Sequence, residues 1–348
     1  RSMPTSPVRL RAGIPILALV LLCSALLPSV ALAQEDPWSK GSIGTGLLLR
    51  KLDGVKRVLM IGAHPDDEDT SLLAALARGQ GVETAYLSLT RGEGGQNLIG
   101  PELDEGLGVV RTGELLAARA LDGGRQFFTR AFDFGYSKSA EETFRYWPLE
   151  ELLRDATWVV RTFRPQVIIS VFSGTTRDGH GQHQAAGIVA REVFRAAGDP
   201  TRFPEQLEAG VSPWAPAKLY RRTRGMPQET PLSLETGVFD PLLGRSHYQV
   251  AMASRSQHRS QDMGMPQPLG PRSSSLTLAE SRVGGVEGEG LFAGVDTTVL
   301  ALARSLPAEL RGSVAEDLDL YRAAIAEAWD HLDAADPWDA TPSLGRAL

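Results

Sequence analysis

The chain has 348 residues, of which 42% are hydrophobic and 22% are charged, as is usual for a globular protein. Its net charge of −6 and the lack of a basic stripe in the sequence give no reason to expect nucleic acid as a partner. The length is enough for one large domain, or for one domain with an extension.

The N-terminal segment, 1–33, has the pattern of a secretory signal peptide. Arg9 precedes an apolar stretch that Pro28 interrupts, and the small side chains of Ala31 and Ala33 suit signal peptidase. We predict cleavage after Ala33 and a periplasmic or secreted product with no stable membrane span. The alternative is an anchor that is kept, but the apolar stretch is short for a span.

The single cysteine, Cys23, lies inside this predicted signal peptide. The mature protein would then have no disulfide, no cysteine nucleophile and no thiolate zinc site. Any metal ion would have to be held by histidine, aspartate or glutamate side chains.

Strand and helix patterns alternate over the next part of the chain. Apolar runs of strand length and helical patterns alternate in the order 55–63, 71–79, 82–90, 109–121, 126–132, 149–163, 166–172 and 183–197. This alternation predicts a Rossmann-like, doubly wound α/β fold, with a mostly parallel sheet and helices on both faces. Ligands of such folds bind outside the carboxyl ends of the strands.

The periodicity is weaker beyond residue 200. The segment "KLYRRT", 218–223, fits one more strand, and "QHRSQ", 257–261, closes a helical segment. Residues 263–288 are rich in Pro, Ser and Gly and predict a long loop. A helical pattern covers 296–332 and is divided at Pro307.

A polar cluster, "HPDDE" at 64–68, follows the first apolar run. An imidazole and a carboxylate suit zinc or a similar divalent ion. Asp66 and Asp67 are adjacent in an extended turn, so their side chains point in different directions. One would bind the metal while the other acts as general base on a water molecule. The alternative is the start of a capped helix with solvated acids. If the metal interpretation holds, Glu68 and Asp69 are left to the helix start, with Asp69 or Thr70 as the cap.

A second cluster, "HGQH", follows the run at 166–172. Its histidines, His180 and His183, are three residues apart at a helix start and would share one face. Two histidines and one aspartate give three ligands and leave a position open, which is the catalytic zinc pattern. This interpretation requires the first and fourth strands to be neighbours, which the sequence pattern does not show.

Together with "LTRGEGG" at 89–95, "RTGELLAA" at 111–118 and "HRSQ" at 258–261, these clusters resemble the PIG-L/LmbE family of zinc-dependent de-N-acetylases. The resemblance extends from about Val55 to Gln261. It implies a Rossmann-like fold and hydrolysis of an N-acetyl group, typically on N-acetylglucosamine, with a metal-bound water as nucleophile.

The resemblance also implies a role for each residue of the two clusters. His64, Asp67 and His183 would bind Zn²⁺, with another divalent metal such as Fe²⁺ as the alternative. Asp66 would be the general base. His180 would stabilise the oxyanion or protonate the leaving amine.

Further residues resemble the family's substrate pocket. These are Arg91 and Glu93 of the glycine-rich loop, Arg111 and Asp133. The alternatives are a flexible turn for the loop and a helix-surface ion pair for Arg111. His258 of "HRSQ" is predicted to be structural.

The sequence departs from the family at Asp178, where some members have a tyrosine that helps to stabilise the oxyanion. Arg177 beside it is the alternative donor. We expect a signal peptide at 1–33, a PIG-L/LmbE-like deacetylase domain at 34–262, and a loop with a helical extension at 263–348. The extension would either cover the pocket or lead to a C-terminal domain outside this sequence.

Two other functions fit parts of this pattern. Two-metal phosphoesterases usually need more carboxylates and histidines than these motifs offer. A non-catalytic carbohydrate-binding protein on the same fold would have no need to keep all of the proposed metal and catalytic residues, and all of them are present. We therefore expect an enzyme that acts on a small-molecule or glycan substrate.

Overall fold

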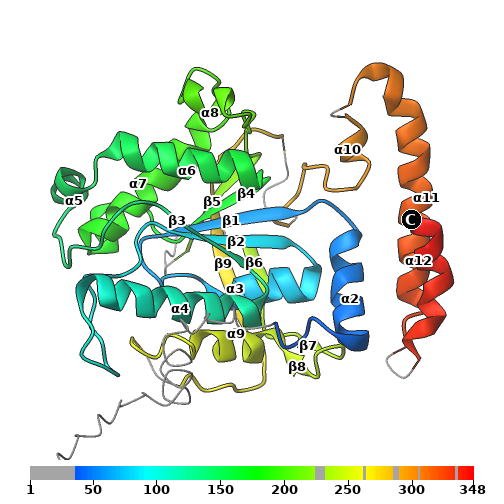
Figure 1. Ribbon diagram of the computed structural model, residues 1–348, viewed down its shortest axis with the longest axis horizontal. Helices are drawn as coiled ribbons and strands as arrows, with labels where there is room; N and C mark the ends of the chain where they lie inside the picture. Colours follow the sequence, from blue (N-terminus) through cyan, green and yellow to red (C-terminus); the bar gives the residue numbers. More distant parts are fainter. Residues whose placement is uncertain (1–35, 224–231, 262–263, 285–289, 305, 334–335) are drawn as a thin grey trace, which may run out of the picture. The chain divides into compact units, whose positions relative to one another are not determined.

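A mostly parallel sheet forms the centre of the computed structural model (Figure 1). The structure describes residues 36–223, 232–261, 264–284, 290–304, 306–333 and 336–348, and the predicted signal peptide lies outside these residues. Within the described ranges, seven strands form this sheet in the order β3-β2-β1-β4-β5-β9-β6. Their bounds are β1 Arg57–Gly62, β2 Glu83–Ser88, β3 Arg125–Phe128, β4 Val167–Ser170, β5 Lys218–Arg222, β6 Leu232–Glu235 and β9 Ser273–Ser281.

Strands β1 and β4 lie in the middle of the sheet, and this position accounts for their continuous apolar sequences. The strands from β3 to β5 pair in parallel, while β9 pairs antiparallel with both β5 and β6. The side chains of β4 and most of those of β1 are buried because helices cover both faces of the sheet. The order reverses between β1 and β4, which is where such folds bind ligands. The predicted α/β fold is therefore confirmed.

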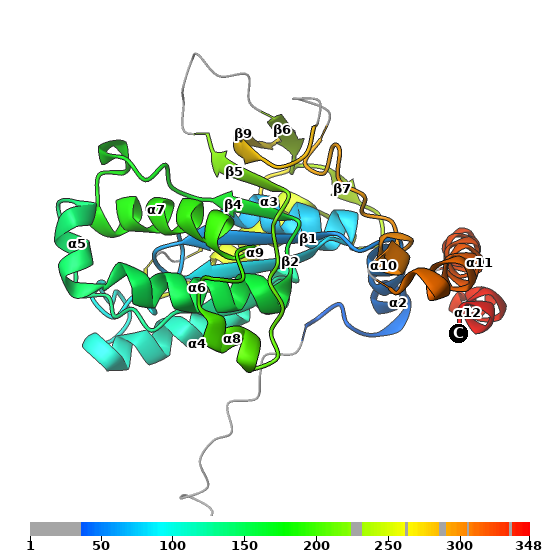
Figure 2. The same ribbon diagram turned by 90° about the horizontal axis from the view of Figure 1, so that it is seen from above.

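Helices α6 and α7 cover one face of the sheet, α3 and α4 cover the other, and α9 packs against α3 and α4 (Figure 1, Figure 2). The predicted helix 149–163 is confirmed to the residue, because Arg164 takes a left-handed conformation and Pro165 follows it. The bounds on these two faces are α3 Thr70–Ala74, continued by a π-helical turn Ala75–Gly79, α4 Asp104–Asp122, α5 Ala140–Tyr146, α6 Leu149–Phe163, α7 Gly181–Ala196, α8 Pro204–Glu208 and α9 His247–Arg255.

The other elements lie at the margins of the sheet. Leu49 of α2 packs with Ile325 and Ala328 of α11 in a small apolar cluster. None of the helices in the described part of the chain combines the length and the apolar character that crossing a bilayer requires. The bounds are α2 Gly41–Leu52, the 3₁₀ turns Thr176–Asp178, Ala308–Leu310 and Pro337–Ala340, the hairpin strands β7 Phe239–Asp240 and β8 Arg245–Ser246, α10 Ala301–Arg304, α11 Arg311–Asp330 and α12 Thr341–Ala347.

The prediction of a long loop over 263–288 is wrong. Strand β9 lies inside that range and pairs with β5 on one side and β6 on the other. Leu276 is fully buried, and Leu278 packs against the main core. Serines and small residues around these leucines weaken the alternation that marks a strand. The sheet therefore contains a strand from beyond residue 262, the predicted end of the catalytic domain.

Candidate active site

Strands β1 and β4 are direct neighbours, as the interpretation of the two histidine clusters requires. Their parallel register pairs Val58 with Val167 and Ile61 with Ser170. Because both strands end at the same edge of the sheet, the segments that follow them meet there. His64 lies two residues beyond β1, and His183 lies in the first turn of α7, which follows β4.

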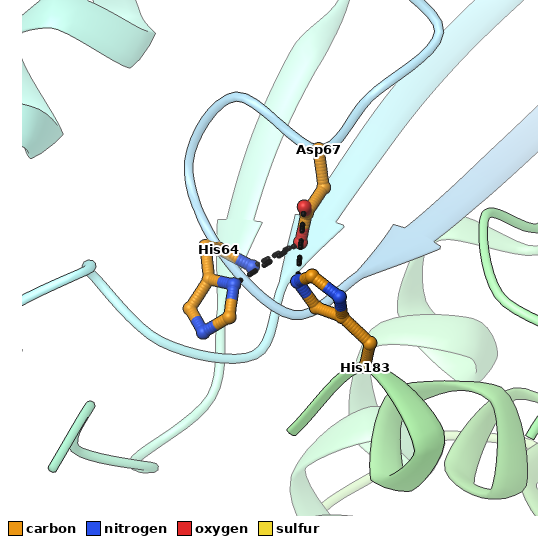
Figure 3. A group of neighbouring side chains, drawn as sticks. All are labelled: His64, Asp67 and His183. Carbon is orange, nitrogen blue, oxygen red and sulfur yellow. Dashed lines mark hydrogen bonds and ion pairs between the residues drawn. The ribbon is translucent and has the colours of Figure 1, made fainter. Parts of the chain in front are cut away.

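His64, Asp67 and His183 form a cluster that fits a metal ion (Figure 3). One donor atom from each side chain lies within 4.8 Å of the other two. His64 Nδ1 is 3.4 Å from Asp67 Oδ2, and His183 Nε2 is 3.5 Å from Asp67 Oδ1. Two imidazoles and one carboxylate are the donor set of a catalytic zinc-type site, with positions left for water and substrate.

Neighbouring groups hold each of these side chains in place. The Asp67 carboxylate accepts hydrogen bonds from the backbone N–H groups of Ala63 at 3.0 Å and His64 at 2.7 Å. The His183 ring is stacked on Phe172, with centroids 4.1 Å apart and planes at 9°. These contacts, together with the ion pair between Asp67 and His64, hold the three side chains in place, which is the preorganisation that a metal site needs.

His64 and Asp67 form an ion pair. Burial would lower the pKa of His64, but the hydrogen bond and charge of Asp67, with the charge of Asp133, raise this pKa to about 9. Burial would raise the pKa of Asp67, but His64 holds that pKa below its usual value. A metal that binds here must displace a proton from His64, so its affinity falls as the pH is lowered.

Asp66 lies beside the cluster and has an unusual backbone conformation. Its φ is +98°, in the region that favours glycine. Its N–H donates to Glu68 Oε2 at 3.0 Å, and its carbonyl accepts a short hydrogen bond from Arg255. Arg111 Nη2 is 3.4 Å from Asp66 Oδ1. The turn thus directs Asp67 toward the two histidines of the cluster and leaves the Asp66 carboxylate outside it.

Burial raises the pKa of Asp66 to about 6, although Arg111 opposes the shift. The charge of Asp67 adds to the increase. A carboxylate with a pKa close to neutrality is better matched to proton transfer at pH 7 than an ordinary aspartate. Its chemistry therefore suits a general base.

Asp69 and Glu68 have different roles. Asp69 caps α3, since its carboxylate accepts the Leu72 N–H at 3.1 Å, as predicted. Glu68, which was also predicted to belong to the helix start, is buried instead. Its Oε1 lies 3.0 Å from Arg119 Nη2 and 3.1 Å from His258 Nε2. The helix-start interpretation of Glu68 is wrong, because its partners come from distant parts of the chain.

His180 is the N-cap of α7, and its ring lies beside the rings of His64 and His183. The ring centroid lies 5.4 Å from that of His64 and 5.0 Å from that of His183. Its Nδ1 accepts the Gln182 N–H at 3.1 Å. Burial and the charges of His64 and His183 lower the pKa of His180 to about 4. A neutral His180 therefore carries its proton on Nε2 and can donate from that atom.

Residues 59–194 match the PIG-L family, described as GlcNAc-PI de-N-acetylase. The matched residues include the three cluster side chains and both candidate catalytic groups. The chain contains a PIG-L domain.

Curated relatives of this PIG-L domain include two proteins named 1D-myo-inositol 2-acetamido-2-deoxy-alpha-D-glucopyranoside deacetylase. The protein of Thermobispora bispora is 33% identical in an alignment of 183 positions, which covers 47% of this chain and 58% of that protein. The protein of Geodermatophilus obscurus is 33% identical in an alignment of 185 positions, which covers 47% of this chain and 60% of that protein. The chain therefore spans less than two thirds of the length of these relatives.

Solved structures similar to the chain include N,N'-diacetylchitobiose deacetylase from Pyrococcus horikoshii. It is 19% identical, with a TM-score of 0.46 over 62% of this chain and 74% of that one. The 4-carboxy-2-hydroxymuconate hydratase GalB from Pseudomonas putida is 17% identical, with a TM-score of 0.46 over 68% of this chain and 99% of that one. Neither similarity is strong enough to bear on function.

Three of the predicted substrate contacts are buried in the PIG-L domain and hold its loops. Glu93 Oε2 accepts the N–H groups of Arg91 at 3.2 Å and Asp133 at 3.1 Å. Arg111 donates to the carbonyl oxygens of Gly92 at 3.0 Å and Pro65 at 2.5 Å. These bonds tie the glycine-rich loop and the loop after β3 around the site. A substrate contact by Glu93, Arg111 or Asp133 stays a prediction.

Arg91 differs from these three because it is exposed at the rim of the PIG-L domain. Its guanidinium lies 4.1 Å from the centroid of the Phe128 ring, and its Nη1 is 3.2 Å from Thr112 Oγ1. Its contact with substrate likewise stays a prediction. The exposure does leave it accessible to a ligand.

Asp178, where some family members have tyrosine, holds its own loop. Its Oδ2 accepts the N–H groups of Gly174 at 2.8 Å and Thr175 at 3.2 Å. An exposed tyrosine from another loop, Tyr136, has its ring centroid 5.0 Å from that of His180. Arg177, the predicted alternative donor, is exposed.

The sequence interpretation missed Gln182, which is fully buried against His64. Its place inside "HGQH", between two histidines predicted to face one site, was the available signal. Glu68 also had a signal. It precedes the N-cap Asp69 and so lies outside the first helical turn, where a solvated acid would interact with the helix dipole.

Proposed function

We propose that the PIG-L domain of this chain is a divalent-metal-dependent hydrolase that removes an acetyl group from an N-acetylglucosamine-type sugar or glycoconjugate. The cluster of His64, Asp67 and His183, with Asp66 beside it, is the observation that carries this proposal. The names of the curated relatives support the class of substrate. Zn²⁺ is the proposed metal, with Fe²⁺ as the alternative.

His64, Asp67 and His183 would hold the metal. When bound, a divalent cation supplies a Lewis acid that polarises the amide carbonyl and lowers the pKa of water toward about 7. The protein contributes the stacking of His183 and the backbone hydrogen bonds to Asp67, which keep the donors in place.

Asp66 would accept a proton from the attacking water while the C–O bond forms. His180 would donate a hydrogen bond from Nε2 to the amide oxygen as negative charge develops there. The proton held by Asp66 then passes to the amide nitrogen and the C–N bond breaks. The free amine leaves with acetic acid, which keeps the second proton of the water and ionises to acetate in solution. Arg111, whose Nη2 is 3.4 Å from Asp66 Oδ1, would hold this carboxylate at the edge of the cluster.

Substitution of Asp66 tests the assigned base. We expect Asp66→Asn to keep the bound metal and to lower kcat by about 10²- to 10⁴-fold, the usual contribution of a general base. Asp317→Asn, an exposed aspartate on α11, is the matched control and should change neither quantity. The measurements are metal content by elemental analysis and acetate release from N-acetylglucosamine, its inositol glycoside and diacetylchitobiose.

Each unexpected outcome removes a different part of the proposal. Full activity of Asp66→Asn would show that another group is the base. A wild-type protein with stoichiometric metal that releases no acetate from a broad panel would exclude the deacetylase, and a parallel panel of phosphate esters would reveal a phosphoesterase. A protein that binds sugars without turnover would be a carbohydrate-binding module.

We also propose that the enzyme acts outside the cytosol. The predicted signal peptide at 1–33 is the only support for this location, and it points to an envelope or external glycan as substrate. The N-terminus of the protein recovered from its native host would settle the matter: it should begin at Gln34. A protein that still starts before Ala33 would contradict cleavage.

A further inference from the structure

We propose that Gln182 is a positioning residue that determines which ring nitrogen of His64 is presented to the metal. The inference rests on the proposed metal site and adds to it a residue that binds neither metal nor substrate. It follows from the hydrogen bonds of one buried amide.

The orientation of the Gln182 amide is fixed by its neighbours. Gln182 is fully buried as the second residue of α7. Its Nε2 donates to Asp133 Oδ1 at 3.1 Å and to the carbonyl oxygen of Gly135 at 2.8 Å. A carboxylate oxygen and a backbone carbonyl only accept, so the NH₂ end of the amide must face them. The opposite end, Oε1, therefore faces His64.

This orientation decides the tautomer of His64. Gln182 Oε1 lies 2.6 Å from His64 Nε2 and can only accept a hydrogen bond. His64 Nε2 must then carry a hydrogen. The lone pair that a metal needs is left to Nδ1, the atom that lies 3.4 Å from Asp67 Oδ2. A hydrogen bond from the second nitrogen of a ligating histidine is the usual means of fixing its ring and its tautomer.

Gln182 also takes the hydrogen bond of His64 Nε2 in place of a second carboxylate. Asp133 Oδ2 is within ion-pair distance of that nitrogen, at 3.8 Å, but Gln182 Oε1 is much closer, at 2.6 Å. With the amide in place, Asp133 Oδ1 is bound by Gln182 Nε2 and by the Gly135 N–H at 2.9 Å. His64 thus receives a neutral acceptor on one nitrogen and keeps Asp67 as the anionic partner of the other.

A neighbouring glutamine provides a matched control. Gln184 is also buried on α7, but it bonds to the loops at 138–140 and 179 rather than to the metal cluster. Gln182→Leu and Gln184→Leu each remove one buried amide of the same size from the same helix. A purely structural role for Gln182 would make the two variants alike.

Metal affinity is the first measurement. The metal-free wild type and both variants are titrated with Zn²⁺ in competition with a chelator of known affinity. We expect Gln182→Leu to weaken zinc binding by about 10- to 100-fold, the usual effect of removing such a partner. Gln184→Leu should bind zinc as the wild type does. Equal affinities for wild type and Gln182→Leu, or equal losses in both variants, would overturn the proposal.

The tautomer itself is the second measurement. In ¹⁵N-labelled, zinc-loaded wild type, NMR should show His64 with hydrogen on Nε2 and zinc on Nδ1. The wild-type spectrum decides this even if the leucine variant fails to fold, and hydrogen on Nδ1 would contradict the proposal. A wild type that binds no metal would instead refute the proposed function, so the two failures are distinct.

Discussion

The backbone of Asp66 is strained, and this residue places a carboxylate beside the cluster of His64, Asp67 and His183. An aspartate at φ +98° costs about 1–3 kcal/mol, which the surrounding contacts must offset. Glu68 and Arg255 bind the two backbone polar groups of Asp66, and Arg111 lies next to its carboxylate. These contacts keep the carboxylates of Asp66 and Asp67, which are adjacent in sequence, in different environments.

The strain predicts an order of stability among variants at this position. Asp66→Gly and Asp66→Ala both remove the carboxylate, but only glycine adopts the positive φ without steric cost. We expect Asp66→Gly to be the more stable of the two by about 1 kcal/mol. Urea denaturation of the metal-free proteins measures the difference. A more stable alanine variant would show that residue 66 is not strained in solution.

The arrangement of the candidate site could be predicted from the sequence to different degrees. Spacing alone placed His180 and His183 together, because a helix start sets their geometry. The choice between Asp66 and Asp67 depended on the family resemblance, since a turn of unknown φ does not show which carboxylate points inward. The motif "HGQH" indicated that Gln182 lies near the site, but not that it contacts His64, because this contact spans 118 residues and depends on the pairing of β1 with β4.

At the scale of elements, buried charges join the loop after β1 to helices α4 and α9. Arg119 of α4 donates to Asp122 at 2.6 Å as well as to Glu68. Ser254 of α9 donates to Asp122 at 2.7 Å, and His258 just beyond α9 contacts Glu68. Glu68 in turn binds the N–H of Asp66. The position of the proposed base therefore depends on how two helices are packed.

Substitution of Arg119, the side chain that binds both Glu68 and Asp122, should reveal this dependence. Arg119→Met would leave the carboxylates of Glu68 and Asp122 buried without their shared partner, at a cost of about 3–5 kcal/mol. Arg125→Met breaks the exposed ion pair with Glu83 and should cost less than about 1 kcal/mol. Denaturant titration compares the two. Similar small losses would mean that the buried network contributes little to stability.

At the scale of the whole molecule, the parallel strands of the sheet were predictable from the sequence, whereas the antiparallel strands were not. Strands β1 and β4 are continuous apolar runs, and β2, β3 and β5 overlap the predicted segments 82–90, 126–132 and 218–223. Strand β9 has two large apolar residues, Leu276 and Leu278, among serines, and it is flanked by residues typical of loops. Its place between β5 and β6 comes from long-range pairing that no local pattern records.

The position of β9 makes residues beyond 262 part of the folding unit. A fragment that ends at 262 would expose the edge of β5, including Leu219 and Tyr220, and would leave β6 without the strand it pairs with. We expect fragment 34–262 to aggregate or to unfold without cooperativity, because an unpaired, apolar strand edge favours association with other chains. A fragment that ends at 304 keeps β9 and should unfold cooperatively and bind Zn²⁺. Circular dichroism during urea titration, with zinc binding as a second readout, compares them. If fragment 34–262 folds and binds zinc as well as the longer fragment, the catalytic domain ends at 262 and β9 is dispensable.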